Sequence, residues 1–417
     1  MFIGNIVAVM KDLKKNLKTV RRAWKNQFGW LRIVRRKLTP PVIKNYFRTN
    51  YNKNALISYV TRPFRKGVTF AHTNSIEALE IAKVFRRLAY NVDVVDFDYE
   101  GRGIDYSKYS VIFGFGDPLV NSFYKRKHPV ITIYYGTGMH VVRQNHAALK
   151  RVKEVYKKKG VWMPESGRIV DKAWSVQTTL VNNIITLGND SVIESYRKYF
   201  DGGIYNIPVS CYKIFDYKEI LSRKNHGVAR KHFLWFGSSG LIHKGLDLLL
   251  EVFKELPDVH LYVCGPINQE KKFQECYYGE LYNTPNIHTY GYVDIKTLLF
   301  KEIISKCGFV ILPSCAEGEP SSVINVMCYG LIPIVPRSAG IRIKDFGLEI
   351  KQLTHESLTQ MVKRAAALSE EEMTKRSFEC AEDTVSGHSI EKFSEELENS
   401  LKEIFEMKKI TDNLYNA

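Results

Sequence analysis

The segment that decides the fold reads FLWFGSSGLIHK and runs from Phe233 to Lys244. Its first four residues are all apolar, which is typical of a strand buried on both faces of a sheet. Gly237 and Gly240 follow in a polar loop, and a helical pattern begins near Gly245. A strand, a glycine-containing loop and a helix in this order predict a parallel α/β sheet, in which ligands bind at the carboxyl ends of the strands.

The same loop is suited to binding an anion. It offers backbone N–H groups and the positive end of a helix dipole, and Lys244 adds a positive charge that suits a diphosphate. We therefore expect a phosphorylated ligand near Gly237, Ser238, Ser239 and Lys244. Taken alone, however, a Gly-Ser loop followed by a lysine is also an ordinary turn.

A second informative segment, PSCAEGEPSSVINVMCYGLIP, covers residues 313–333. Glu317 follows a strand predicted at residues 309–312, and Ser321 or Ser322 is placed to cap the next helix. Asn325 lies near the start of that helix, so a spacing of eight can bring Glu317 and Asn325 to one pocket. Glu317 could accept hydrogen bonds from sugar hydroxyls and Asn325 could bind ribose. The alternative is a capped helix with a solvated glutamate.

The rest of the chain alternates between strand-like and helical patterns on both sides of a polar junction at residues 208–230. Strands separated by helices predict parallel sheets with covered faces. We expect a domain over residues 54–212, a second over 213–389, and a final amphipathic helix at about 390–417 that packs back on the first. The strands are predicted at residues 68–71, 92–97, 111–115, 130–135, 183–187, 233–236, 260–264, 287–290, 309–312 and 332–335, and the main helices at 75–88, 142–158, 246–256, 296–306 and 322–329.

Several motifs of the carboxyl half occur together in one order: Lys244-Gly245, Gly265, Gly291, Glu317-Gly318, Met327 and Gly330-x-x-Pro333. In this order they resemble the carboxyl domain of glycosyltransferase family 4. The resemblance covers residues 232–345 best and implies a GT-B fold, in which two Rossmann-like, doubly wound parallel-sheet domains face a cleft. It also implies retention of anomeric configuration and donor contacts from Gly265, Ser321, Ser322, Val323 and Asn325.

Two positions depart from the family pattern. Ser238 stands where the family has an arginine, and Asn325 stands where it has a second glutamate. The resemblance implies that an arginine and a lysine hold the diphosphate, so in this chain Lys244 and the backbone amides are expected to do so.

The amino half resembles the acceptor domain of such enzymes more weakly. Its candidate segments are residues 71–75 (AHTNS) and 135–140 (YGTGMH), the second at a strand end. We expect His140 to face the reacting centre, with Glu317 and Lys244 opposite. Acceptor-side contacts are expected from His72, Asn74, Thr137 and Asn145. A hydrogen-bonded structural histidine is the alternative for His72 and His140.

The formal net charge of +17 is concentrated in residues 1–53, which hold eight Lys and six Arg against one acid, Asp12. Apolar residues recur there at helical spacing between Leu13 and Leu38, with basic residues on the other faces. Such a helix suits an anionic membrane surface, and we expect residues 1–38 to bind one. A helix packed on its own domain and a nucleic-acid-binding arm are the alternatives; no other nucleic-acid module is apparent.

The remaining patterns favour a cytoplasmic protein that is peripheral to the inner face of the plasma membrane. No apolar stretch approaches the roughly 20 residues of a membrane span. The apolar residues Met1–Met10 come before the first basic residues, whereas a secretory signal peptide has its basic residues first. Seven cysteines without C-x-x-C spacing favour a reducing compartment.

The sequence therefore predicts a retaining glycosyltransferase that moves a sugar from a nucleotide diphosphate sugar to a lipid-linked or surface-polysaccharide glycan. No cofactor or metal is expected, since the resemblance implies a site that stabilises the leaving diphosphate with helix amides and cations rather than with a metal. The alternatives are a GT-B protein that binds a nucleotide sugar or glycan without transferring it, a nucleotide-sugar epimerase, and a nucleic-acid-binding protein.

Overall fold

A computed structural model describes residues 40–172 and 174–416. Two parallel sheets form the core of residues 44–417. The strands of one lie between Lys53 and Ile207, and those of the other lie between His232 and Ile350. The predicted α/β fold with two doubly wound sheets is thereby confirmed. The predicted membrane helix at residues 1–38 lies outside the described residues, and β1 (Val42–Ile43) is the first strand described.

Within residues 44–417, the strands of the first sheet are adjacent in the order β3-β2-β4-β5-β6-β7. All the pairs are parallel. Ala55, Leu56 and Ile57 of β2 are fully buried because β3 and β4 pair with it on either side. The order reverses direction between β2 and β4, a topological switch point of the kind where ligands bind. The strands are β2 (Lys53–Tyr59), β3 (Tyr90–Asp96), β4 (Val111–Gly114), β5 (Ile131–Gly136), β6 (Asn183–Leu187) and β7 (Gly203–Ile207).

The strand predicted at residues 68–71 is wrong, since this segment is a loop. Val68 is exposed, and the backbone N–H of Thr69 donates to Ser75 Oγ at 2.9 Å instead of to a strand. The first central strand is β2, which was missed because its charged start continues the basic arm.

The second sheet has the order β10-β9-β8-β11-β12-β13, again all parallel. This is the strand order of a Rossmann fold, with its switch point between β8 and β11. Phe233, Leu234 and Trp235 of β8 are at most 1% exposed, as the continuous apolar run predicted. The strands are β8 (His232–Phe236), β9 (His260–Cys264), β10 (Ile287–Gly291), β11 (Phe309–Ile311), β12 (Ile332–Pro336) and β13 (Leu348–Ile350).

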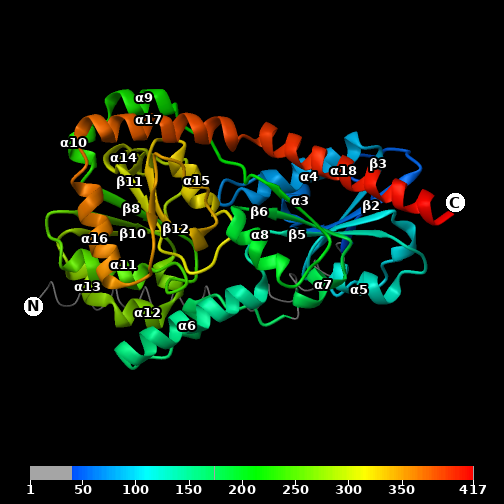
Figure 1. The fold of residues 1–417 in the computed structure, drawn as a ribbon, viewed down its shortest axis with the longest axis horizontal. Helices are drawn as coiled ribbons and strands as arrows, with labels where there is room; N and C mark the ends of the chain where they lie inside the picture. Colours follow the sequence, from blue (N-terminus) through cyan, green and yellow to red (C-terminus); the bar gives the residue numbers. More distant parts are fainter. Residues whose placement is uncertain (1–39, 173, 417) are drawn as a thin grey trace, which may run out of the picture. The chain divides into compact units, whose positions relative to one another are not determined.

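Helices connect the strands of both sheets (Figure 1). The first part of the chain has α3 (Arg62–Lys66), α4 (Asn74–Arg87), α5 (Asp117–Lys125), α6 (Val141–Lys159), α7 (Trp174–Leu180) and α8 (Asp190–Arg197). The second has α9 (Tyr217–Arg223), α10 (His226–Ala229), α11 (Leu246–Lys254), α12 (Lys271–Cys276), α13 (Tyr278–Asn283), α14 (Leu298–Lys306), α15 (Ser321–Met327) and α16 (His355–Ala366). Among the helices of the described residues, none combines the length and apolar character that a membrane span requires.

Two helices at the end of the chain run from the second sheet to the first. In Figure 1, α17 (Glu370–Gly387, orange) lies beside the second sheet and α18 (Ile390–Asn416, red) continues beside the first. Ser377 of α17 donates to the backbone oxygen of Gly330 at 2.7 Å. Arg87 of α4 donates to Glu398 of α18 at 2.7 Å. The carboxyl end of the chain thus packs on the amino-terminal sheet.

Candidate functional site

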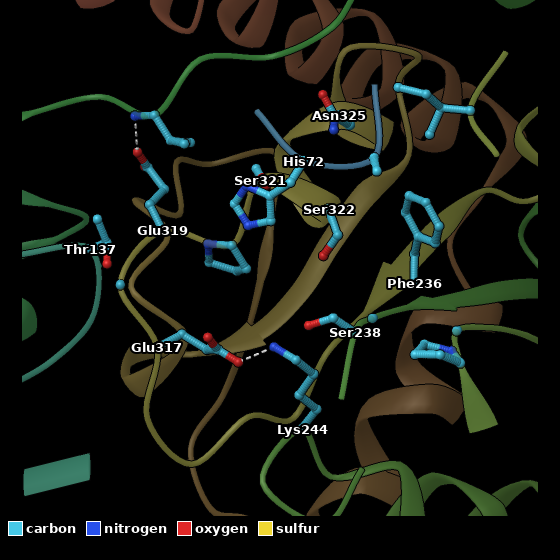
Figure 2. Close-up of a pocket in the computed structure, with 18 of the residues that line it drawn as sticks. His72, Thr137, Phe236, Ser238, Lys244, Glu317, Glu319, Ser321, Ser322 and Asn325 are labelled. Atoms are coloured by element: carbon cyan, nitrogen blue, oxygen red, sulfur yellow. Dashed lines mark hydrogen bonds and ion pairs between the residues drawn. The ribbon is translucent and has the colours of Figure 1, made fainter. Parts of the chain in front are cut away.

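A cavity of about 320 Å³ lies between the carboxyl ends of the two sets of strands (Figure 2). The second sheet contributes the loops after β8, β9, β10 and β11. The first contributes Tyr59 at the end of β2, His72 before α4, Thr137 after β5 and Leu187 at the end of β6. Both topological switch points therefore open into one space.

Close backbone packing brings the two main loops of the second sheet together. Gly245 has a φ of 69°, and a Cβ at this position would lie 2.4 Å from the backbone oxygen of Pro313. Only glycine fits such an approach in the left-handed region. The loop that carries Lys244 is therefore held against the loop that carries Glu317.

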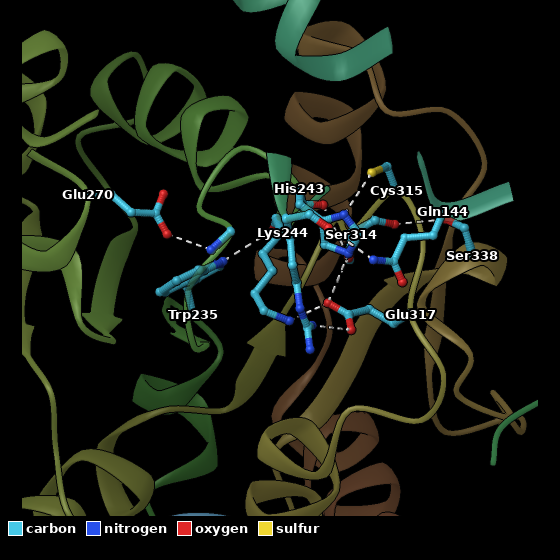
Figure 3. A network of polar contacts seen from close by, with 11 residues as sticks. Gln144, Trp235, His243, Lys244, Glu270, Ser314, Cys315, Glu317 and Ser338 are labelled. Carbon is cyan, nitrogen blue, oxygen red and sulfur yellow. Dashed lines mark hydrogen bonds and ion pairs between the residues drawn. The ribbon is translucent and has the colours of Figure 1, made fainter. Parts of the chain in front are cut away.

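Hydrogen bonds with Glu270 and Trp235 also hold the loop after β8. The carboxylate of Glu270 accepts hydrogen bonds from the backbone N–H groups of Gly240, at 2.5 Å, and Leu241, at 3.1 Å. Trp235 Nε1 donates to the backbone oxygen of Lys244 at 3.3 Å. These contacts hold the backbone of Lys244, so its ammonium group is directed into the cavity (Figures 2 and 3).

Lys244 and Glu317 form a buried ion pair at the cavity wall. Glu317 Oε1 also accepts a hydrogen bond from Ser314 Oγ at 3.2 Å and lies 3.5 Å from His243 Nε2. Arg168 NH1 donates to the other carboxylate oxygen, Oε2, at 3.2 Å. Figure 3 shows Lys244, His243 and Ser314 gathered around the carboxylate of Glu317.

Burial alone would raise the pKa of Glu317, but Lys244, His243 and Arg168 hold it well below its usual range. The carboxylate is therefore ionised at neutral pH. Burial lowers the pKa of Lys244 against the opposing effect of Glu317. Lys244 and Glu317 are almost completely buried, so their interaction is stronger than that of a surface pair, whereas the Arg168 side chain is about half exposed.

The start of α15 forms another wall of the cavity, which Ser321, Ser322 and Asn325 line. The predicted serine cap is wrong, because Pro320 occupies the N-cap position and no side chain caps the helix. Asn325 Oδ1 accepts a hydrogen bond from the backbone N–H of Tyr212 at 2.7 Å. Its amide nitrogen is therefore the atom available to a ligand.

The amino-terminal wall contains His72 and Thr137, as Figure 2 shows. His72 is exposed to the cavity, and its Nδ1 accepts a hydrogen bond from the backbone N–H of Asn74 at 3.1 Å. Loss of water around the ring, together with the charges of Arg168 and Lys244, lowers the pKa of His72 to about 4. The imidazole is consequently neutral at physiological pH.

His140 is not at the cavity, which corrects its predicted place at the reacting centre. The side chain is 1% exposed, and its Nε2 lies 2.8 Å from Thr178 Oγ1. Its ring stacks on Tyr199 with centroids 4.3 Å apart, and its Nδ1 accepts from the backbone N–H of Val142 at the start of α6. His140 therefore caps and packs α6, which was the structural alternative for this residue.

Four other predicted contact residues also lie outside the cavity walls: Ser239, Val323, Asn74 and Asn145. Asn145 is occupied by the backbone of Val170, donating to its oxygen at 2.8 Å and accepting from its nitrogen at 2.9 Å. Val323 is fully buried inside α15, and Asn74 begins α4. The remaining predicted residues Gly237, Ser238, Lys244, Gly265, Glu317, Ser321, Ser322, Asn325, His72 and Thr137 line the cavity.

Sequence reasoning missed three charged residues of the cavity wall, namely Arg168, Glu77 and Glu319. Glu319 Oε2 accepts from the backbone N–H of Val209 at 2.8 Å. Arg168 follows a short 3₁₀ turn, η2 (Pro164–Gly167), in a segment without periodicity. Glu319 belongs to the EGEP sequence and could have been included, whereas Glu77 and Arg168 had no local signal.

Described residues offer no group of three or more His, Cys, Asp or Glu side chains that could hold a metal ion.

Comparison with known proteins gives one family and a set of similar folds. The profile of the family described as Glycosyl transferases group 1 matches residues 218–344. None of the curated proteins compared matches the sequence. Sucrose-phosphate synthase from Thermosynechococcus elongatus has a TM-score of 0.59 at 13% identity, over 85% of this chain and 99% of that one.

Two further structures have the same kind of likeness. Anabaena Alr3699/HepE, in complex with UDP and glucose, has a TM-score of 0.53 at 12% identity, over 84% of this chain and 99% of that one. The α,α-trehalose 6-phosphate synthase from Burkholderia multivorans has a TM-score of 0.54 at 8% identity, over the same shares of the two chains. At these identities the likeness concerns the fold.

Proposed function

We propose that this chain, which has the GT-B fold and matches the family of glycosyl transferases group 1 over residues 218–344, is a glycosyltransferase that uses a nucleoside diphosphate sugar as donor. In the proposed reaction, the bond between the anomeric carbon and the diphosphate oxygen breaks. A hydroxyl oxygen of the acceptor forms the new bond to that carbon, and its proton leaves with the nucleoside diphosphate. The anomeric configuration is retained.

The observation that carries this proposal is the Lys244–Glu317 pair at the wall of a cavity between two sets of strand ends. Negative charge develops on the leaving diphosphate as the sugar bond breaks. The buried ammonium group of Lys244, held in place beside Glu317, lies at the wall where that charge would develop and can stabilise it. Glu317, ionised beside it, is the acceptor for hydroxyl groups of the donor sugar.

The nucleoside would extend along the start of α15. Since Asn325 Oδ1 is taken by Tyr212, its amide nitrogen would donate to a ribose hydroxyl. Ser321 and Ser322 add hydroxyl groups at the same wall.

The acceptor would approach from the wall made by the amino-terminal half. His72 and Thr137 both line the cavity there. Because His72 is neutral and its Nδ1 already accepts from Asn74, its Nε2 carries the proton and can donate a hydrogen bond to an oxygen of the acceptor.

We further propose that the acceptor is a lipid-linked or surface-polysaccharide glycan, reached at the cytoplasmic membrane face. Helix α6 supports this, because Val142, Leu149 and Tyr156 are each about 45% exposed and recur every seven residues. Such spacing places them on one face of the helix. Trp162, 46% exposed, extends the stripe and contacts the Tyr156 ring.

Basic side chains flank this apolar stripe of α6. Arg143, Lys150, Lys153 and Lys157 are all exposed. An apolar stripe beside exposed cations suits the interface of a membrane that contains anionic lipids. We propose that α6 and residues 1–38 both contact that surface.

Turnover tests the proposed function. The full chain should release UDP, GDP or ADP from one labelled nucleotide sugar, and should transfer the label to a lipid-linked glycan in the presence of EDTA. Hydrolysis without added acceptor would still establish donor use. Absence of both release and transfer with every donor would contradict the proposal.

A protein that binds the donor without transferring it is the second candidate. Two features favour it: Ser238 is uncharged, and Asn325 replaces a carboxylate and has its oxygen occupied. Binding of a nucleotide sugar without any turnover would establish this alternative.

A further inference from the structure

A nucleoside diphosphate carries at least two negative charges, and the loop after β8 supplies only part of the compensation. Between Phe236 and Gly245 the loop has Lys244 as its one Lys or Arg, and Ser238 at the cavity wall is neutral. Of the described residues that line the cavity, Arg168 is the other lysine or arginine. It comes from the amino-terminal half of the chain, beyond the group 1 domain.

The backbone at Arg168 is held directly against the loop that carries Lys244. The backbone N–H of His243 donates to the oxygen of Ser166 at 2.9 Å. A Cβ on Gly240 would lie 3.0 Å from Cβ of Arg168. Gln144 of α6 donates to the backbone oxygen of Arg168 at 3.0 Å, so the residue is fixed from both sides.

This position is maintained in an unfavourable backbone conformation. Arg168 has a φ of 52°, in the left-handed region that few residues other than glycine adopt. Residues held in this way occur preferentially at functional sites, where the surrounding structure imposes the conformation. Here the conformation places a guanidinium group at the cavity.

The guanidinium group has bonding capacity left for a ligand. NH1 donates to Glu317 Oε2 at 3.2 Å, and the side chain is about half exposed. Within the described part of the chain, Nε and NH2 of Arg168 donate no hydrogen bond that would compete with a ligand. Lys244, Ser314 and His243 all contact the other carboxylate oxygen of Glu317, Oε1. The buried carboxylate would therefore still have partners if Arg168 turned to a ligand.

We propose that Arg168 is a donor-binding residue that contacts the diphosphate together with Lys244. The proposal rests on the proposed function and deepens it, because it assigns half of the diphosphate site to the amino-terminal part of the chain. Arginine can bind two phosphate oxygens at once through its fork of N–H donors. Donor binding would thereby require the two halves of the protein to be together.

Titration calorimetry on the full chain tests the proposal, with UDP, GDP and ADP as ligands and their nucleosides for comparison. Arg168→Ala should weaken binding of the best diphosphate by at least about tenfold, as loss of charge-assisted hydrogen bonds does. Binding of the matching nucleoside should change less than threefold, by the same reasoning. Arg102→Ala, at an exposed arginine that pairs with Glu100, is the matched control and should bind like the wild type.

Two outcomes separate this proposal from a structural role of Arg168. Arg168→Ala/Ser238→Arg returns a cation to the same cavity and should recover most of the diphosphate affinity, while a merely structural role predicts no rescue. Equal diphosphate affinity in Arg168→Ala, Arg102→Ala and the wild type would overturn the proposal and leave the proposed function standing. Absence of diphosphate binding by the wild type would overturn both.

Discussion

Lys244 and Glu317 neutralise each other inside the cavity, so a diphosphate has to compete with a carboxylate for the same ammonium group. The two residues should therefore act differently on binding. Lys244→Ala removes the cation and should weaken binding of a nucleoside diphosphate. Glu317→Ala removes the competing carboxylate but also the group that opposes the lowering of the Lys244 pKa, so it should weaken binding less than Lys244→Ala does.

Catalysis should be reduced in both variants. Each substitution should lower the rate of sugar transfer at least tenfold, about 1.4 kcal/mol in the activation barrier. Lys254→Ala is the matched control, since Lys254 lies on α11 but its side chain is 60% exposed. Near-normal transfer rates in both variants would contradict the assignment.

Glu77 is a second buried acid at the cavity, and its ionisation should affect stability. Burial raises the pKa of Glu77 to about 7, although Ser210 donates to it through both its backbone N–H and its hydroxyl. An acid with a raised pKa stabilises the fold below its unfolded value, near pH 4.5, and loses that contribution as the pH rises through about 7.

Glu77→Gln keeps an oxygen for Ser210 and cannot ionise. Relative to the wild type, the variant should gain stability between pH 5 and pH 8, on the order of 3 kcal/mol at the most. Urea unfolding at the two pH values measures the difference. A difference that is the same at both values would show that Glu77 does not titrate in this range.

At the scale of elements, the prediction concerns the exposed face of α6. Leu149→Glu/Tyr156→Glu places two negative charges on the apolar stripe and should reduce co-sedimentation with anionic vesicles several-fold. Neutral vesicles should bind weakly in every case. Leu298→Glu is the control, because Leu298 is 80% exposed on another helix, α14. If this control reduces binding as much as the α6 variant, the stripe is not a specific contact.

The sequence predicted some elements well for physical reasons. β8 and β11 of the second sheet are apolar runs that a loop follows, so the hydrophobic pattern and the turn residues gave the same prediction. β2, β7 and β13 were missed: β2 begins with the polar residues Lys53 and Asn54, β7 is only partly buried, and β13 has three residues. Length and exposure weakened the pattern at these strands.

Of the residues at the candidate site, some could likewise be predicted from the sequence and others could not. Lys244, Glu317 and Asn325 lie in two contiguous segments whose order and spacing could be recognised. His140 was misplaced because a histidine after a strand-end glycine loop can face either the cavity or its own helix. Arg168 was missed because only the packing of η2 against the loop after β8 brings it to the site.

At the scale of the whole molecule, a buried ion pair joins the two halves. Arg151 of α6 donates to Asp247 of α11 at 2.5 Å, and both side chains are almost completely buried. Removing one partner leaves the other charge buried without compensation. Arg151→Ala should therefore lower the free energy of unfolding by about 3–5 kcal/mol.

A double-mutant cycle with Asp247→Ala checks this pair. The double variant should lose much less stability than the two single variants added together, since no charge remains unpaired. Additive losses would show that the pair does not couple the two helices.

The most direct test of the whole account is an experimental structure of the protein with UDP, GDP or ADP, whichever binds best. We predict that the diphosphate lies between the two sheets, with Lys244 Nζ within hydrogen-bonding distance of its oxygens and the nucleoside along the start of α15. A nucleotide bound elsewhere, with the Lys244–Glu317 pair undisturbed and the cavity between the sheets empty, would contradict the account.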